Sequence, residues 1–216
     1  MTQLRVLVPL LALPVAACVG DGDREVIIIQ NNVPSTGCSI PASLDSAFYP
    51  SGIIETNSGR GYRLTPVIQN FSEAQTEADE TRRLAFIEGA LVDLSFGDPD
   101  LFSDSEEAEL RDDGLTRFDV PLAAVVGAGD TVSLGFEVIP RQLFDRMALA
   151  AGDSTVVLAN VRIYGEMGGS GFESQTYRYP VEVCNGCLIV DNGQCAALPT
   201  DFAPRTGGAC NPLQAG

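Results

Sequence analysis

The residues with the most obvious chemistry are cysteines near the C-terminal end of the chain. Cys184 and Cys187 enclose an Asn-Gly pair in a Cys-x-x-Cys motif, and Cys195 and Cys210 follow. The cysteines of such a motif form disulfides, bind zinc or take part in thiol–disulfide exchange. A redox motif of the thioredoxin type opens a helix, and a four-thiolate zinc site usually has a second Cys-x-x-Cys motif. The chain shows neither feature here, so disulfides are favoured, with redox and zinc chemistry as alternatives.

An acidic segment between Asp98 and Asp113 is the second candidate, since Arg111 is its only basic residue. Calcium prefers oxygen ligands, although the spacing and central glycine of an EF-hand are absent. We expect a solvated loop and helix face, with a weak calcium site as the alternative. The candidate ligands for that site are Asp98, Asp100 and Asp104. The other acidic residues of the segment are Glu106, Glu107, Glu109, Asp112 and Asp113.

The residue inventory excludes several kinds of chemistry. The chain has no histidine, lysine or tryptophan, which removes histidine-assisted serine hydrolysis, Schiff-base chemistry and imidazole metal sites. Its formal charge is −16, which repels the phosphates of nucleic acids. Only carboxylate or thiol chemistry remains, and a nucleic-acid partner is not expected.

The hydrophobic pattern along most of the chain has a period of two. Residues 132–138, 157–163 and 177–183 alternate apolar with polar side chains. This alternation is typical of strands with one face against a core. Further strands are expected near residues 50–56, 62–70, 84–96 and 116–126, giving about seven strands in all.

Two short helices are expected between these strands. One begins after Pro140 and extends towards Gly152, because proline favours a helix start and glycine a helix end. The other begins after Ser103, which can form a capping box with Glu106. Because parallel strands need long crossovers, the pattern predicts an all-β fold, an antiparallel β-sandwich that is immunoglobulin-like or similar.

The N-terminal segment carries a targeting motif. Arg5 precedes an apolar run from Val6 to Val15, and two alanines then lead to Cys18. The run is about half the roughly 20 residues that a membrane helix needs. The arrangement resembles a bacterial lipoprotein signal peptide closed by a lipobox. The resemblance implies that residues 1–17 are removed, that the Cys18 thiol carries acyl chains such as palmitate, and, because Val19 rather than aspartate follows, that the protein resides in the outer membrane.

The cysteine-rich end carries a further resemblance. The segments Tyr179 to Leu188 and Gly208 to Pro212 resemble the C-terminal ends of uncharacterised predicted lipoproteins from GC-rich Gram-negative bacteria. The resemblance implies a shared envelope scaffold and assigns no catalytic residue.

Five cysteines remain if Cys18 is acylated, and an odd number cannot all pair within one chain. Long loops gain more from closure than short ones, so we expect Cys184 or Cys187 to reach Cys195 or Cys210. Cys38 is the candidate for the odd thiol. A bond from Cys38 to the C-terminal tail is the alternative.

These observations divide the chain into a signal peptide, an acylated N-terminus with a tether (residues 18–37), a β-sandwich (residues 38–190) and a tail packed on it (residues 191–216). Within the tether, residues 25–29 form a mainly apolar run that is a candidate edge strand and that we expect to be covered. We expect a non-enzymatic, lipid-anchored envelope protein with a structural, adhesive or partner-binding role and no cofactor or metal. Its lipid anchor contacts the membrane, on the periplasmic or the cell-surface face, and its expected partner is an unidentified protein or another envelope component. The alternatives are a carboxylate-dependent hydrolase of envelope polymers and a small-ligand-binding sandwich.

Overall fold

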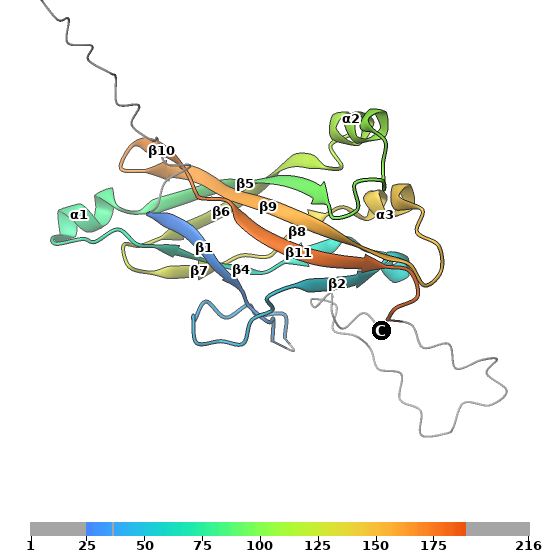
Figure 1. Cartoon of the computed structure of the whole chain (residues 1–216). Coiled ribbons are helices and arrows are strands. Elements are labelled where there is room, and N and C mark those ends of the chain that lie inside the picture. Colours follow the sequence, from blue (N-terminus) through green and yellow to red (C-terminus); the bar gives the residue numbers. More distant parts are fainter. Residues whose placement is uncertain (1–24, 36, 189–216) are drawn as a thin grey trace, which may run out of the picture.

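A computed structural model describes residues 25–35 and 37–188. Within these residues it contains eleven strands and three short α-helices (Figure 1). The strands are β1 (Val26–Asn31), β2 (Gly52–Glu55), β3 (Tyr62–Leu64), β4 (Pro66–Asn70), β5 (Ala85–Phe96), β6 (Arg117–Val126), β7 (Thr131–Ser133), β8 (Phe136–Ile139), β9 (Ser154–Met167), β10 (Ser170–Glu173) and β11 (Tyr177–Cys184). The helices are α1 (Glu77–Arg82), α2 (Asp104–Asp112) and α3 (Arg141–Met147), with a 3-10 turn, η1, at Thr56–Ser58.

The strands form one large sheet and two smaller ones. The large sheet has the order β2-β11-β9-β5-β6, with β10 paired to β9. The smaller sheets are β1-β4-β7 and β3-β8, and Figure 1 shows them against one side of the large sheet. A single apolar core contains buried residues from all three sheets. The predicted all-β, sandwich-like fold is therefore confirmed.

Along the long strands, every second side chain lies in this core. In β9, Val157, Ala159, Val161 and Ile163 are fully buried. The residues between them are partly exposed, as the sequence predicted for residues 157–163. Strand β11 repeats the pattern with Tyr179, Val181 and Val183. Strand burial on one face thus follows directly from the period of two.

The expected number of about seven strands was too low because two predicted strands each divide between sheets, and because β1 and β10 were not among the seven. The run 62–70 breaks at Thr65 into β3, which pairs with β8, and β4, which pairs with β1 and β7. The run 131–138 breaks at Gly135 in the same way. Each segment passes from one sheet to the other. The alternation of apolar and polar residues continues through this change of sheet, so it does not reveal it.

One strand pair is parallel, contrary to the all-antiparallel expectation. Strand β2 runs parallel to β11, and Cys184 lies opposite Glu55. A parallel pair requires a long crossover. Most of the domain lies between these two strands and supplies it.

The first strand is an edge strand of the sandwich, as the apolar run at residues 25–29 suggested, although these residues were assigned to the tether. Val26 is fully buried, Ile28 nearly so, and β1 pairs with β4. The boundary predicted at residue 38 was therefore wrong, and the sandwich already includes residues 26–31. Asn31 and Asn32, which lie in the segment assigned to the tether, are buried polar residues.

Asn31 at the end of β1 makes buried hydrogen bonds to β11 and to Thr65, the residue between β3 and β4. Its Nδ2 donates to the Tyr179 hydroxyl of β11 at 2.9 Å, and its Oδ1 accepts from the Thr65 backbone N–H at 2.6 Å. The Tyr179 hydroxyl lies 3.2 Å from that of Tyr62 in β3. Gly52 of β2 completes the cluster, because a β-carbon there would overlap the Tyr62 ring. This polar cluster fixes β1 against both sheets.

The helices begin largely as predicted. Ser103 and Glu106 form the expected capping box at α2, and Pro140 is the N-cap of α3. Helix α3 ends at Met147, before Gly152, because Ala148 adopts a left-handed conformation. Helix α1 was not predicted; the Thr76 hydroxyl caps it.

We predict that Asn31→Ala lowers the free energy of unfolding by about 3 kcal/mol, because buried donors and acceptors lose their partner. Urea unfolding measures the change. Asn57→Ala, at an exposed asparagine, is the matched control and should change stability by less than about 0.5 kcal/mol. Equal losses in the two variants would contradict the role of Asn31.

We also predict a loss of stability in alkaline solution. Burial raises the pKa of Tyr177 to about 12, and it also raises the pKa of Tyr62 and of Tyr179 above the usual value of 10.0. The unfolded chain therefore releases tyrosine protons first, so stability is fully present below about pH 10 and falls as the pH rises towards 12. With no lysine in the chain, tyrosines dominate this range.

Urea unfolding at several pH values, followed alongside tyrosinate absorbance, tests this dependence. Tyr177→Phe should make the alkaline decline shallower. Stability that stays constant up to pH 12 in the wild-type protein would show that the tyrosines ionise freely in the folded state.

Candidate functional site

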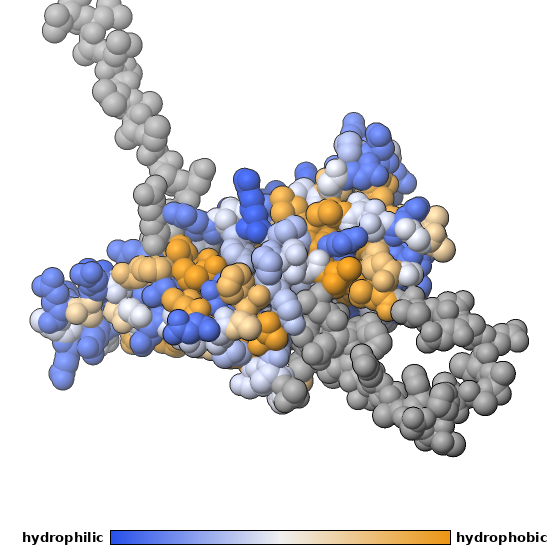
Figure 2. Space-filling model, turned by 60° about the horizontal axis from the view of Figure 1, so that its bottom comes forward, coloured by the Kyte–Doolittle hydropathy of each residue, from blue (hydrophilic) through white to orange (hydrophobic). Residues whose placement is uncertain are grey.

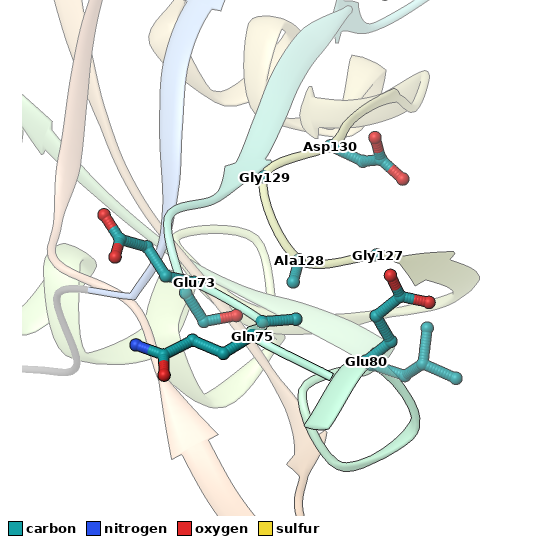
Figure 3. Close-up of a pocket in the computed structure, with 10 residues that line it drawn as sticks. Glu73, Gln75, Glu80, Gly127, Ala128, Gly129 and Asp130 are labelled. Carbon is teal, nitrogen blue, oxygen red and sulfur yellow. The ribbon is translucent and has the colours of Figure 1, made fainter. Parts of the chain in front are cut away.

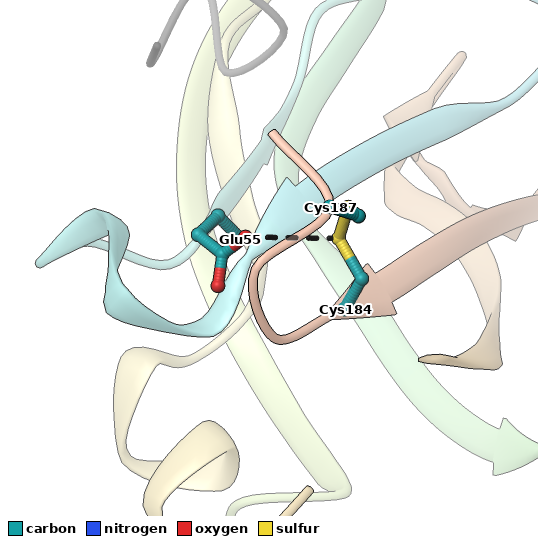
Figure 4. Close-up of side chains that lie close together, drawn as sticks. All are labelled: Glu55, Cys184 and Cys187. Atoms are coloured by element: carbon teal, nitrogen blue, oxygen red, sulfur yellow. Dashed lines mark hydrogen bonds between the residues drawn. A yellow bond between two sulfur atoms is a disulfide. The ribbon is translucent and has the colours of Figure 1, made fainter. Parts of the chain in front are cut away.

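The Cys-x-x-Cys motif lies where β11 ends, beside the end of β2. The backbone register places Cys184 opposite Glu55, although 129 residues separate them in sequence. Figure 4 shows the Glu55 side chain directed towards the two cysteines. The Cys184 Sγ lies 4.0 Å from Glu55 Oε2. The structure therefore brings a carboxylate to a thiol motif.

The two cysteines of the motif form a disulfide with each other, with their Cα atoms 5.8 Å apart. The expectation that Cys184 or Cys187 would bond to Cys195 or Cys210 was wrong. The turn between them explains the difference, because Gly186 has a φ of 90°, a left-handed conformation that favours glycine and turns the chain back. The loop-entropy argument considered only the unfolded chain and ignored this local geometry.

Cys38 also takes part in a disulfide, and Cys184 and Cys187, bonded to each other, are not its partners. The assignment of Cys38 as the odd thiol was therefore wrong. Cys18, Cys195 and Cys210 lie outside the described residues. The alternative that joins Cys38 to the C-terminal tail stays a prediction.

Glu55 is the functional candidate that sequence reasoning missed. It is only 2% exposed, and both of its carboxylate oxygens lie 2.8 Å from the Gly186 backbone nitrogen. Its Oε2 also accepts from Leu188 N–H at 3.4 Å. A carboxylate that ends an otherwise apolar strand was the only signal in the sequence, and its partners are remote.

Among the described residues, Glu55, Cys184 and Cys187 are also the one group of three potential metal ligands, with their ligand atoms within 4.8 Å of one another. A structural zinc ion takes four ligands, and its cysteine ligands are thiolates. Here the two sulfurs are bonded to each other. The arrangement as it stands is a disulfide beside a carboxylate.

The acidic segment does not gather its side chains in the same way. Asp98 accepts from the backbone N–H of Asp100 at 2.9 Å in an exposed turn, and Asp104 begins α2. Over residues 25–35 and 37–188 these carboxylates do not form a group of three converging ligands. Glu106 is held by the capping box, whose hydrogen bonds from Ser103 lower the pKa of its carboxyl.

A cavity of about 640 Å³ lies between α1 and the β6–β7 turn (Figure 3). Asn70 shapes this region, since its Nδ2 donates to the Arg83 carbonyl at 2.7 Å and its backbone N–H donates to the Asp130 carbonyl at 3.1 Å. The acidic residues along the cavity are Glu73, Glu80 and Asp130, all exposed. Figure 3 shows their carboxylates pointing in different directions.

A smaller cavity of about 330 Å³ lies between the end of β5 and α2. Asp93, Glu107 and Arg111 line it together with apolar and backbone atoms. The Arg111 guanidinium and the carboxylates of Asp93 and Glu107 give this cleft charges of both signs.

None of the helices in the described residues has the length and apolar character needed to cross a membrane. Comparison with protein-family models gives no match for this chain, and no curated protein matches it. Function must therefore be argued from the chain itself.

We predict that peptide mapping without reductant will find Cys184 joined to Cys187, and Cys38 joined to Cys195 or Cys210. The Cys184–Cys187 pair follows from the geometry, and the Cys38 bond follows because Cys18 is assigned to acylation. Mass spectrometry after proteolysis checks both. Recovery of Cys38 as a free thiol, or bonded to Cys184, would contradict this pairing.

Proposed function

We propose that this protein is a lipid-anchored envelope protein that acts through partner contacts rather than catalysis. The motif ending at Cys18 supports the lipid anchor. Val19, which follows it, supports an outer-membrane location. The observation that carries the structural part of the proposal is the position of β1.

Strand β1 begins at Val26, eight residues after Cys18. Just before it, the Glu25 carbonyl accepts from Phe71 N–H at 2.6 Å, and the Glu25 carboxylate lies 3.8 Å from Arg83. Eight residues span at most roughly 28 Å when fully extended. An acylated Cys18 would therefore hold the sandwich close to the membrane surface.

The same geometry orients the domain. Glu25 contacts the segment just before β5, where Ala85 pairs with Met167 at the end of β9. Cys184 pairs with Ser154 at the other end of β9, so the disulfide lies at the opposite end of the sheet (Figure 1). The end of the domain where β1 starts would face the membrane. The end that carries the disulfide would face the surrounding compartment.

Exposed apolar side chains support a partner-binding role. Phe86 in β5 and Val125 in β6 lie directly opposite each other and are 47% and 53% exposed. Their neighbours Ala85, Ile87 and Val126 are buried, so the pair occupies the outer face of the large sheet. On the face shown in Figure 2, apolar patches alternate with polar ones. This distribution suits local contacts with a partner.

A hydrolase of envelope polymers has less support. Such an enzyme pairs two carboxyl groups, and burial keeps one of them protonated. The carboxylates beside the larger cavity are exposed. Burial does raise the pKa of Glu137 in β8, but Arg63 acts against it, and Glu137 lines neither of the two cavities. A small-ligand role would need an apolar interior, whereas polar and acidic residues line much of the larger cavity.

The lipid anchor is tested by metabolic labelling with a fatty acid. The wild-type protein should be labelled and should enter the detergent phase, because acyl chains are the only membrane attachment that we assign. Cys18→Ser should lose both properties. Equal labelling of the two proteins would contradict the anchor.

Partner binding is tested with a photo-crosslinking phenylalanine analogue at Phe86 in living cells. We expect a discrete adduct that disappears in Val125→Glu, which places a charge on the contact. The same analogue at Phe48, exposed outside the large sheet, is the control. Adducts that survive Val125→Glu would argue against the Phe86–Val125 surface.

A further inference from the structure

The Cys184–Cys187 disulfide joins two sulfurs in different surroundings. Cys184 is completely buried, whereas Cys187 is exposed. Thiol–disulfide exchange begins when a thiolate attacks one sulfur, and access decides which sulfur is attacked. An incoming thiolate therefore reaches Cys187, and Cys184 is the sulfur that leaves.

Glu55 lies beside the leaving sulfur. Its Oε2 is 4.0 Å from Cys184 Sγ, and the backbone N–H groups of Gly186 and Leu188 hold the carboxylate in place. A thiol must lose its proton before it attacks a disulfide. A buried carboxylate at this position can accept that proton (Figure 4).

The loop around the motif is held by hydrogen bonds that do not involve the two sulfurs. The Asn185 N–H donates to the Asp153 carbonyl at 3.0 Å, and the Gly152 N–H donates to the Asn185 carbonyl at 2.7 Å. The Asn185 side chain donates to the Leu149 carbonyl at 2.8 Å. A disulfide closing so short a loop adds little stability through the unfolded chain. We therefore expect the disulfide to open without unfolding of the domain.

We propose that Cys184, Cys187 and Glu55 form a reversible dithiol–disulfide site that exchanges electrons with the dithiol of a partner protein. The partner's thiolate attacks Cys187 Sγ, the bond between the two cysteines breaks, and Cys184 leaves as a thiolate that takes up a proton. The partner's second thiolate then attacks the partner's sulfur in the mixed disulfide and releases Cys187. Two electrons and two protons pass from the dithiol to this protein, and the partner becomes a disulfide.

Glu55 acts in the reverse direction. A disulfide of the partner first forms a mixed disulfide with Cys187. The Cys184 thiol then gives its proton to Glu55 Oε2 and attacks Cys187 Sγ, which closes the ring and releases the partner's thiolate. This role distinguishes the site from a disulfide that only braces a turn.

The test uses the full-length mature protein, opened with dithiothreitol under native conditions and then mixed with oxidised glutathione. Acid quenching and peptide mapping follow glutathione on each cysteine over time. We expect glutathione on Cys187 first, followed by the Cys184–Cys187 disulfide. Glu55→Gln should lengthen the life of the mixed disulfide at least about tenfold and change the pH profile of ring closure, because the proton acceptor is lost.

Glu182→Gln is the matched control, since it removes an exposed carboxylate two residues before Cys184 on the same strand. It should leave the life of the mixed disulfide unchanged. Thermal unfolding establishes that each variant is folded.

If Glu55→Gln does not fold, two other variants test the order of attack. Glutathione should remain on Cys187 in Cys184→Ser, whereas Cys184 in Cys187→Ser should react only after unfolding.

Three results would overturn the proposal. The first is a disulfide that dithiothreitol does not open in the folded protein. The second is glutathione that appears on Cys184. The third is a folded Glu55→Gln variant that closes the ring at the wild-type rate and with the wild-type pH profile.

Discussion

The buried hydrogen bonds of Asn31 are the interaction on which the rest of the structure depends. Through Thr65 they hold the corner where one chain segment crosses between sheets, and through Tyr179 they reach the large sheet. A buried polar network is specific because each unsatisfied member is costly. Fixing β1 in this way sets where the folded domain begins, and hence how close a lipid at Cys18 would hold it to the membrane.

Sequence reasoning succeeded where a local pattern reports burial directly. The alternation in β9 and β11 gave the core residues, and the Ser103–Glu106 pair gave the start of α2. It failed where distant contacts decide the structure. Asn31 was assigned to the tether, and only Tyr179, 148 residues away, shows why it is buried.

The candidate site shows the same contrast between local patterns, which the sequence reveals, and remote contacts, which it does not. The Cys-x-x-Cys motif was evident, but its pairing depended on the left-handed conformation of Gly186, which a global entropy argument ignores. Glu55 carried almost no signal, because its role arises from the parallel pairing of β2 with β11. Remote strand pairing therefore brings the Glu55 carboxylate to the Cys184 sulfur, and this juxtaposition is the basis of the proposed exchange chemistry.

Amide hydrogen exchange of β1 tests the central claim most directly, namely that the sandwich begins at Val26. We predict that amides of Val26–Asn31 that bond to β4 are protected to nearly the same free energy as those of β9 in the core, because the Asn31 network opens only when the domain unfolds. Rapid exchange throughout β1, with β9 still protected, would contradict this prediction and show that Val26–Asn31 belongs to a tether.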